Sequence, residues 1–252
     1  VPAILATEPL KGYLLLSDLG DVSLLSAISD KNADRWYQLA IKDLLCLQGL
    51  SPHNINDFLM PHYDHTLITR EWTIFTHWFL GRYKKVDLQQ HHEMLDSCFS
   101  TLKQTMIEQP QVFIHRDYHS RNLMVQDDEH LAIIDFQGAR IGPISYDVAS
   151  LLKDCYIDWP AEQVEQWALQ FQQQAWLQHD LAPVSKEQFL RWFHVTGLQR
   201  HLKVLGQFSR KALAEGNSDY LPDMPRVLEY VLSTCRQYPE FKALADLIES
   251  GQ

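Results

Sequence analysis

Hydrophobic residues recur along most of the chain at the spacing of one helix face, three and four positions apart. The helix predicted over residues 32–48 begins at Asn32, a candidate N-cap, and ends before Gly49 and Pro52. In a helix predicted over residues 66–80, the aromatic residues are expected in the core: Trp72, Phe75, Trp78 and Phe79. The same spacing predicts helices over residues 88–107, from about 146, and over 161–179, 186–206, 219–236 and 239–249.

Short apolar runs interrupt this helical pattern in two places. The stretch GYLLLSDLGD (residues 12–21) has three consecutive leucines and ends in a turn, so it predicts a buried strand. Three more short strands are expected at residues 112–114, 123–125 and 131–134. The fold class is therefore predicted to be α+β and mostly helical, with one strand at the start and a small group of strands in the middle.

Composition narrows the class of protein. The chain is 46% hydrophobic and 21% charged, which is typical of a soluble globular protein. Its net charge of −10 (22 − 32) argues against sequence-independent binding of nucleic acid, which needs a basic surface. The four cysteines are widely spaced and form no CxxC, as expected for free thiols in the cytoplasm. No apolar stretch reaches the roughly 18 residues of a membrane span, so we expect no membrane partner.

The middle strands enclose the most polar loop of the chain, in the stretch VFIHRDYHSRNLMV. Asp117 and Asn122 stand five positions apart in it, and Asp135 follows the next strand but one. Carboxylate and carboxamide oxygens at strand ends are good ligands for Mg²⁺, which also needs a phosphate-bearing partner. Ordinary turn residues are the alternative. A zinc site at His115 and His119 is disfavoured, because no third ligand follows at a recognisable spacing.

These residues carry a resemblance to a known family. The spacing of HRD and Asn122 matches the H-R-D-x-x-x-x-N catalytic loop of the protein-kinase-like fold, and Asp135 stands where that fold has D-F-G. The small-molecule branch, the aminoglycoside phosphotransferase family, is more similar than the protein kinases, since no activation loop or A-P-E follows. Three stretches resemble the bacterial kinases of N-acetylmuramate and N-acetylglucosamine, which phosphorylate the anomeric hydroxyl: HRDYHSRNLM, DFQGARIGPISYDVASLLKDCYIDWP and GLQRHLKVLGQFSR.

The resemblance implies a role for each matching residue, with ATP and Mg²⁺ as cofactors. Asp117 would accept or orient the proton of the attacking hydroxyl, and Arg121 would face the transferred phosphate, with a salt bridge inside the loop as its alternative. The remaining roles implied are Mg²⁺ ligation by Asn122 and Asp135, support of the loop by His115 and Asp147, and adenine binding by the hinge residues Ser17, Asp18 and Leu19.

For four further residues, a binding role and a structural role both remain open. Arg200, His201 and Lys203 lie on a predicted helix, where they form either an exposed basic face or a contact to sugar or phosphate. Trp159 either stacks on a sugar ring or packs in the core, and packing is favoured.

At the start of the chain, the sequence lacks motifs that are typical of the protein-kinase-like fold. The sequence contains no G-x-G-x-x-G, no V-A-I-K lysine and no partner glutamate, and it opens with Val-Pro rather than Met. Residues 1–20 are therefore expected to be a remnant of the N-terminal lobe with the hinge, and residues 21–252 the helical C-terminal lobe. Weak ATP binding and poor turnover are expected. Gln137 replaces the usual glycine after Asp135, which leaves the role of Asp135 unchanged.

Three functions follow, in order of preference. The first is ATP-dependent phosphorylation of a hydroxyl group on an amino sugar. The second keeps the chemistry but takes an aminoglycoside or a choline-like amino alcohol, which the net negative charge favours. The third is a non-catalytic pseudokinase or binding module. Four cationic side chains favour an anionic sugar over a cationic acceptor: Arg121, Arg140, Arg200 and Lys203.

Overall fold

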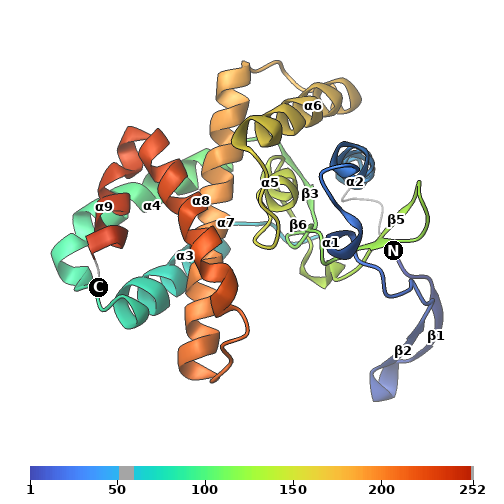
Figure 1. Cartoon of the computed structure of the whole chain (residues 1–252), viewed down its shortest axis with the longest axis horizontal. Helices are drawn as coiled ribbons and strands as arrows, with labels where there is room; N and C mark the ends of the chain where they lie inside the picture. The colour runs from blue at the N-terminus through green and yellow to red at the C-terminus, as the bar shows by residue number, and fades with distance from the viewer. Residues whose placement is uncertain (51–59, 251–252) are drawn as a thin grey trace.

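A long helix, α7 (Lys186–Ala214), runs through the middle of the molecule and touches most of the other helices (Figure 1). The computed structural model describes residues 1–50 and 60–250. The helices of that part are α1 (Leu24–Ala27), α2 (Ala33–Gln48), α3 (His65–Ile74), α4 (His92–Ile107), α5 (Tyr146–Leu152), α6 (Ala161–His179), α7, α8 (Met224–Gln237) and α9 (Lys242–Ser250). The predicted helix-rich α+β class is confirmed.

Most predicted helix boundaries lie within a few residues of the observed ones. Helix α6 covers the predicted range, whereas α7 continues eight residues beyond the predicted end at 206. Asn32 is the N-cap of α2, but its Oδ1 accepts a hydrogen bond from the Ser29 backbone N–H at 2.7 Å instead of capping the helix. The predicted stop at Pro52 lies outside the described residues.

The helix predicted over residues 66–80 is interrupted by a change of winding. Helix α3 passes into the π-helical segment η2 (Phe75–Tyr83), which packs against α7. Gly206 of α7 allows this approach, because an added Cβ would lie 2.7 Å from the Ile74 carbonyl and the Phe75 Cα. Phe75 and Phe79 are buried as predicted, while Trp72 and Trp78 are half-buried.

Four short strands, one more than predicted, form the middle of the chain. Strand β3 (Gln111–Ile114) pairs antiparallel with β6 (Arg140–Pro143), and β4 (Leu123–Val125) pairs antiparallel with β5 (Leu131–Ile133). Strand β6 was missed because its sequence, Arg-Ile-Gly-Pro, has the composition of a turn. The loop of residues 115–122 therefore connects two separate two-stranded sheets, and its ends are fixed by both.

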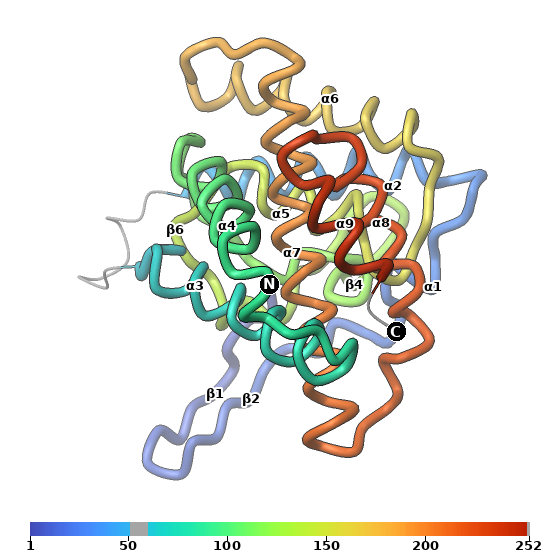
Figure 2. The backbone as a smooth tube through the Cα atoms, turned by 90° about the vertical axis from the view of Figure 1, so that its left-hand side faces the viewer, coloured from blue at the N-terminus to red at the C-terminus, as the bar shows by residue number. Residues whose placement is uncertain are grey.

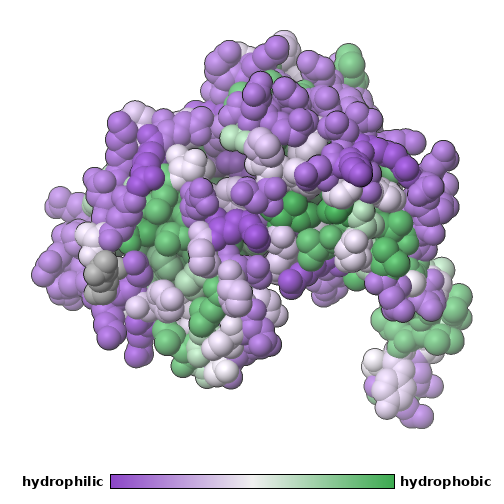
Figure 3. All heavy atoms as spheres, viewed as in Figure 1, coloured by the Kyte–Doolittle hydropathy of each residue, from purple (hydrophilic) through white to green (hydrophobic). Residues whose placement is uncertain are grey.

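The first two strands form a hairpin that extends away from the helices, as Figures 1 and 2 both show. Within residues 1–50 and 60–250, strand β1 (Ile4–Glu8) pairs only with β2 (Tyr13–Leu16), and every residue of both strands is exposed. Leu14 is 63% exposed, so the prediction of a buried strand here was wrong. The apolar run does form a strand, but among the described residues no element covers its faces, and Figure 3 shows apolar side chains on the hairpin surface.

Two hydrophobic cores meet along α7. The first joins α2, α5, α6 and the N-terminal half of α7, and the second joins η2, α4, α8, α9 and the C-terminal half of α7. None of the helices in the described ranges 1–50 and 60–250 combines the length and hydrophobicity needed to span a bilayer. The middle strands lie against the first core, so this core supports both ends of the 115–122 loop.

Candidate active site

Asp147 holds the backbone of the HRD stretch from below. It lies in the first turn of α5, is fully buried, and accepts hydrogen bonds from the backbone N–H groups of His115 (2.6 Å) and Arg116 (2.9 Å). Burial raises the pKa of Asp147 to about 7, against the opposite effect of these two donors. Arg116 has a left-handed backbone with φ of 76°, a conformation that a non-glycine residue adopts only when its surroundings hold it there.

His115 links the loop to the end of β5. The imidazole is buried, its Nε2 donates to the Ile134 carbonyl at 3.0 Å, and its Nδ1 accepts from the Asp117 N–H at 3.3 Å. This pairing requires the neutral ring with its proton on Nε2. Burial lowers the pKa of His115, in agreement with a neutral ring. The His115 ring therefore links the loop to the residue that precedes Asp135.

A buried glutamate that the sequence analysis overlooked neutralises two cations beneath the loop. Glu71 of α3 accepts from Arg116 Nη2 at 2.7 Å and from Gln199 Nε2 at 2.9 Å, and lies 3.6 Å from Lys203 Nζ. It also accepts from the Tyr63 hydroxyl. Burial alone would raise the pKa of Glu71, but the hydrogen bonds and cations outweigh it and lower the pKa. The sequence did carry one sign that Glu71 is buried: it lies on the apolar face of the helix predicted over residues 66–80.

Three polar side chains lie close together at this loop: those of Asp117, Asn122 and Asp135. Asn122 Nδ2 donates to the Asp117 carbonyl at 2.9 Å and lies 3.5 Å from Asp135 Oδ2. Asp135 follows β5 with φ of 66° and is exposed, and its other oxygen is contacted by the Gln137 side chain. No described residue donates a hydrogen bond to Asn122 Oδ1. Two kinds of hard oxygen, carboxylate and carboxamide, are therefore available at one point, as a Mg²⁺ site requires.

These three residues line an open cavity of about 340 Å³ whose opposite wall is cationic. Arg200 and Lys203 of α7 form that wall, and they are only 4% and 5% exposed. The alternative of an exposed basic face is therefore wrong, because this side of α7 faces the HRD loop. Burial acts to raise the pKa of Asp117, but Lys203 and Arg200 outweigh it and lower the pKa, so the carboxylate stays ionised at neutral pH.

Arg121 stacks on an aromatic ring at the rim of the same cavity. Its guanidinium carbon lies 3.6 Å from the centre of the Tyr156 ring, a cation–π contact. No carboxylate of a described residue lies within 4.0 Å of Arg121, so the alternative of a salt bridge inside the loop is not found. The adjacent Asp154 accepts from the Ser120 backbone N–H at 2.9 Å and fixes the segment that carries Tyr156.

The sequence analysis also missed part of the lining from α7 and the segment after it. Gln207, Lys211 and Tyr220 line the cavity together with Tyr156. Lys211 Nζ lies 3.8 Å from the centre of the Tyr220 ring. Gln207 and Lys211 lie beyond the helix end predicted at residue 206, and Tyr220 lies in another predicted helix, so only the observed path of α7 shows that these residues come near Asp117.

The remaining predicted site residues lie elsewhere. Ser17, Asp18 and Leu19 do not line the Asp117 cavity: Ser17 closes the β1–β2 hairpin, Asp18 Oδ1 accepts from the Gly20 N–H, and the Leu19 carbonyl accepts from Gln126. Trp159 is half-buried, and its indole N–H donates to the Tyr37 hydroxyl at 2.7 Å. It packs against the first core, as the favoured alternative states, and lines different cavities.

The described residues contain no group of three His, Cys, Asp or Glu side chains placed to hold a metal ion. His115 uses both ring nitrogens within the loop, and His119 Nε2 lies 3.5 Å from the Asn122 amide. Neither histidine is thus arranged with a third ligand of the kind a zinc site needs.

Comparison with known proteins agrees with this geometry. Residues 1–184 match the model of the phosphotransferase enzyme family. The chain belongs to this family. It is 36% identical over 251 residues to an N-acetylmuramate/N-acetylglucosamine kinase of Pseudomonas aeruginosa, covering 99% of this chain and 73% of that protein. The kinase of the same name from Neisseria meningitidis is 33% identical, with 98% of this chain and 74% of that protein covered. These matches show a small-molecule kinase, a class that uses nucleotide and a small acceptor.

Solved structures of low sequence identity share its fold. An ethanolamine kinase from Plasmodium vivax superposes with a TM-score of 0.66 at 14% identity, over 96% of this chain and 70% of that one. An aminoglycoside phosphotransferase solved with gentamicin superposes with a TM-score of 0.60 at 12% identity, over 95% and 75%. The kinase-like fold expected from the HRD loop is thus confirmed, while the division at residues 20 and 21 stays a prediction.

Proposed function

We propose that the chain transfers the γ-phosphoryl group of ATP to the anomeric hydroxyl of an amino sugar, with N-acetylmuramate and N-acetylglucosamine as acceptors. The observation that carries this proposal is the cavity in which Asp117, Asn122 and Asp135 face Arg200 and Lys203. The similarity to kinases named for these two sugars, over nearly the whole chain, supports the choice of acceptor.

Asp117 orients the attacking hydroxyl and takes its proton. The hydroxyl oxygen forms a bond to the γ-phosphorus, the bond from that phosphorus to the β–γ bridging oxygen breaks, and ADP leaves. In a loose transition state positioning contributes more than basicity, so the low pKa of Asp117 is compatible with this role. His115 and Asp147 act only by holding the loop in place, through the contacts described above.

Asn122 and Asp135 are the residues of this chain that would hold Mg²⁺. Two protein ligands suit Mg²⁺, which keeps waters and phosphate oxygens in its other positions. When bound, the ion neutralises charge on the nucleotide phosphates. The guanidinium of Arg121 stacks on the Tyr156 ring at the rim of the cavity, where it contacts the transferred phosphate.

Arg200 and Lys203 discriminate between acceptors. Both are buried cations, and Arg200 Nε and Nη1 have no hydrogen-bond partner among the described residues. A buried donor without a partner is energetically costly. We therefore expect Arg200 to donate hydrogen bonds either to an anionic group of the acceptor or to the transferred phosphate. Cationic aminoglycosides and choline-like alcohols would meet repulsion here, which places the aminoglycoside and choline alternatives second.

Nucleotide binding at Ser17, Asp18 and Leu19, and the assignment of residues 1–20 to a remnant lobe, stay predictions. The sequence given carries no glycine-rich loop to cover the phosphates, so weak ATP binding and slow turnover are expected. Titration calorimetry with ATP and Mg²⁺ measures this directly; micromolar affinity together with a kcat above about 1 s⁻¹, the lower end for kinases, would contradict it.

An acceptor panel tests the proposed substrate. The chain is incubated with γ-labelled ATP and N-acetylmuramate, N-acetylglucosamine, gentamicin, choline or ethanolamine, and labelled product is measured. We expect product with the two amino sugars only, and a product whose phosphate is released by mild acid, as from an anomeric phosphate. Preferential labelling of a cationic acceptor would replace the proposal with the second candidate, and no transfer to any acceptor would favour a non-catalytic module.

A further inference from the structure

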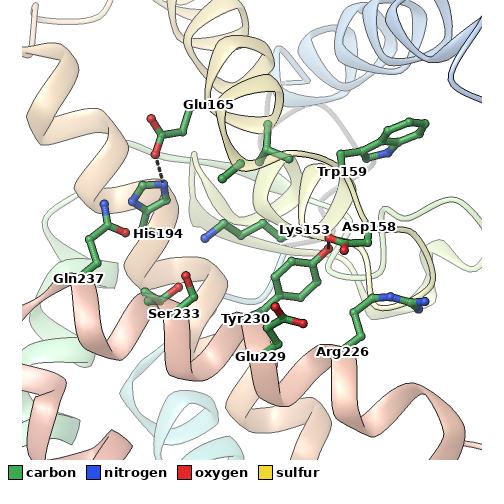
Figure 4. A pocket seen from close by; sticks show the side chains of 13 residues that line it. Lys153, Asp158, Trp159, Glu165, His194, Arg226, Glu229, Tyr230, Ser233 and Gln237 are labelled. Atoms are coloured by element: carbon green, nitrogen blue, oxygen red, sulfur yellow. Dashed lines mark hydrogen bonds and ion pairs between the residues drawn. The ribbon is translucent and has the colours of Figure 1, made fainter.

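A second cavity lies behind the segment that follows α5, and it shares no lining residue with the Asp117 cavity. It is enclosed by α6, α7, α8 and residues 153–159, and its volume is about 290 Å³. Figure 4 shows side chains from all of these elements pointing into it. The proposed phosphoryl transfer uses none of them.

Lys153 is the central group of this cavity. Its side chain extends across the space, with the amino group on the side of His194 and Glu165 (Figure 4). No described residue accepts a hydrogen bond from Nζ, and no carboxylate of the described part lies within 4.0 Å of it. Burial lowers the pKa of Lys153 to about 8, and Glu165 opposes that shift. Lys153 is half-buried, and an ammonium group that lines a cavity without a hydrogen-bond acceptor from the described residues would be stabilised by an anionic ligand group.

The acidic side chains around Lys153 limit the charge of that ligand. Glu165 lies 3.4 Å from His194 Nε2, and burial lowers the pKa of His194 to about 2, so the ring is neutral and this contact is not a salt bridge. Asp158 Oδ1 lies 3.1 Å from the Tyr230 hydroxyl, whose single proton it shares with the Ile157 carbonyl, and Glu229 lies at the exposed rim. Three carboxylates against Lys153 and Arg226 would repel a polyanion such as a nucleotide, but they accept hydrogen bonds from hydroxyl groups.

Size and shape narrow the ligand further. About 290 Å³ is at the low end for small-molecule pockets, which run from roughly 300 to 1,000 Å³, so a single sugar ring fits better than a disaccharide. Trp159 supplies an apolar wall, fixed by its hydrogen bond to Tyr37. Ser233 and Gln237 add neutral polar groups at the rim.

We propose that this cavity binds a monosaccharide that carries one anionic group, carboxylate or phosphate, with Lys153 Nζ as the partner of the anion. The site is tied to the Asp117 loop through the backbone of residues 154–157. Arg226 Nη1 donates to the Cys155 carbonyl at 2.9 Å and the Tyr230 hydroxyl to the Ile157 carbonyl at 3.0 Å, while Asp154 holds the loop at Ser120. A ligand here therefore touches the side chains that fix the segment beneath the active site.

Calorimetry without nucleotide tests the site on the 252-residue chain. The probes are glucuronate for the carboxylate, glucose 6-phosphate for the phosphate, and glucose and inorganic phosphate as half-ligands. We expect at least one charged sugar to bind, and at least about tenfold more tightly than either half-ligand, because a hydrogen bond to a charged group adds to the sugar contacts. If neither charged sugar binds, or if glucose binds equally well, the proposal is overturned.

Two pairs of variants locate the binding. Ser233→Trp fills the mouth of this cavity from an exposed position, whereas Gln207→Trp fills the Asp117 cavity. Lys153→Met removes the charge at similar length, and exposed Ala243→Trp on α9 controls for added bulk. Charged-sugar affinity is expected to fall at least about tenfold in the Ser233 and Lys153 variants and to stay unchanged in the other two. Binding lost with Gln207→Trp but kept with Ser233→Trp contradicts the proposal, and because no turnover is measured, this outcome does not depend on the proposed function.

Discussion

Asp117 is ionised because two buried cations of α7 face it. Lys203 is tied to Glu71, while Arg200 keeps two nitrogens without a partner among the described residues. Both lower the pKa of Asp117 against the effect of burial. The carboxylate that we propose accepts the substrate proton therefore stays ionised below neutral pH, and the cations of α7 lower its pKa more than His119 and Arg116 of its own loop do.

Replacing Arg200 with Gln removes one of these cations. The pKa of Asp117 is then expected to rise, because the ionised form loses a favourable interaction. The acid limb of kcat/KM, which falls as Asp117 is protonated, should move to higher pH. Lys211→Gln is the matched control, since Lys211 lines the same cavity but is not among the main groups that shift Asp117. Equal shifts in both variants, or none in either, would contradict this electrostatic account.

At the scale of elements, the 115–122 loop was predictable and its surroundings were not. The polar residues between two apolar runs predicted the loop and its strands, and the spacing of Asp117, Asn122 and Asp135 predicted that these three residues meet at one site. Burial of Arg200 and Lys203 was not predictable, because long-range packing of α7 decides which helix face is covered. The π-helical segment η2 was missed for the same reason: its wide turn fits against Gly206, 123 positions beyond its last residue.

Gly206→Ala tests that close contact. A methyl group 2.7 Å from backbone atoms of Ile74 and Phe75 cannot be accommodated unless the elements separate. We expect a loss of about 1–3 kcal/mol in the free energy of unfolding, measured in urea. Gly49→Ala is the control, since its added Cβ would meet neighbours at 3.5 Å or more and its φ is −77°. A Gly206 variant as stable as the Gly49 variant would contradict the packing described.

At the scale of the whole molecule, the sequence pattern predicted the burial of the β1–β2 hairpin wrongly: its apolar residues are exposed. Leu14 and Leu15 formed a run typical of a buried strand, but burial depends on a partner element, and the sequence pattern does not show whether one is present. Both strands of the hairpin carry unpaired outer edges and apolar faces. Such surfaces promote association in solution.

Self-association through the hairpin is therefore expected. Sedimentation velocity of the chain at increasing concentration should show a rising sedimentation coefficient, and Leu14→Lys with Leu15→Lys should reduce the rise. Leu177→Lys is the control, because Leu177 is 86% exposed but lies on α6, away from the hairpin. A chain that stays monomeric at all concentrations, or a rise abolished equally by the Leu177 variant, would count against this expectation.

The central claim, that the Asp117 cavity performs phosphoryl transfer to an amino sugar, is tested most directly by one ratio. The rate of label transfer from ATP to N-acetylmuramate is compared between the chain and its Asp117→Asn variant under identical conditions, so that a slow absolute rate does not affect the result. The account predicts a fall of about 10²–10⁴-fold in kcat, with acceptor and nucleotide binding by calorimetry changed by less than about threefold. Equal transfer rates in the two proteins would contradict it.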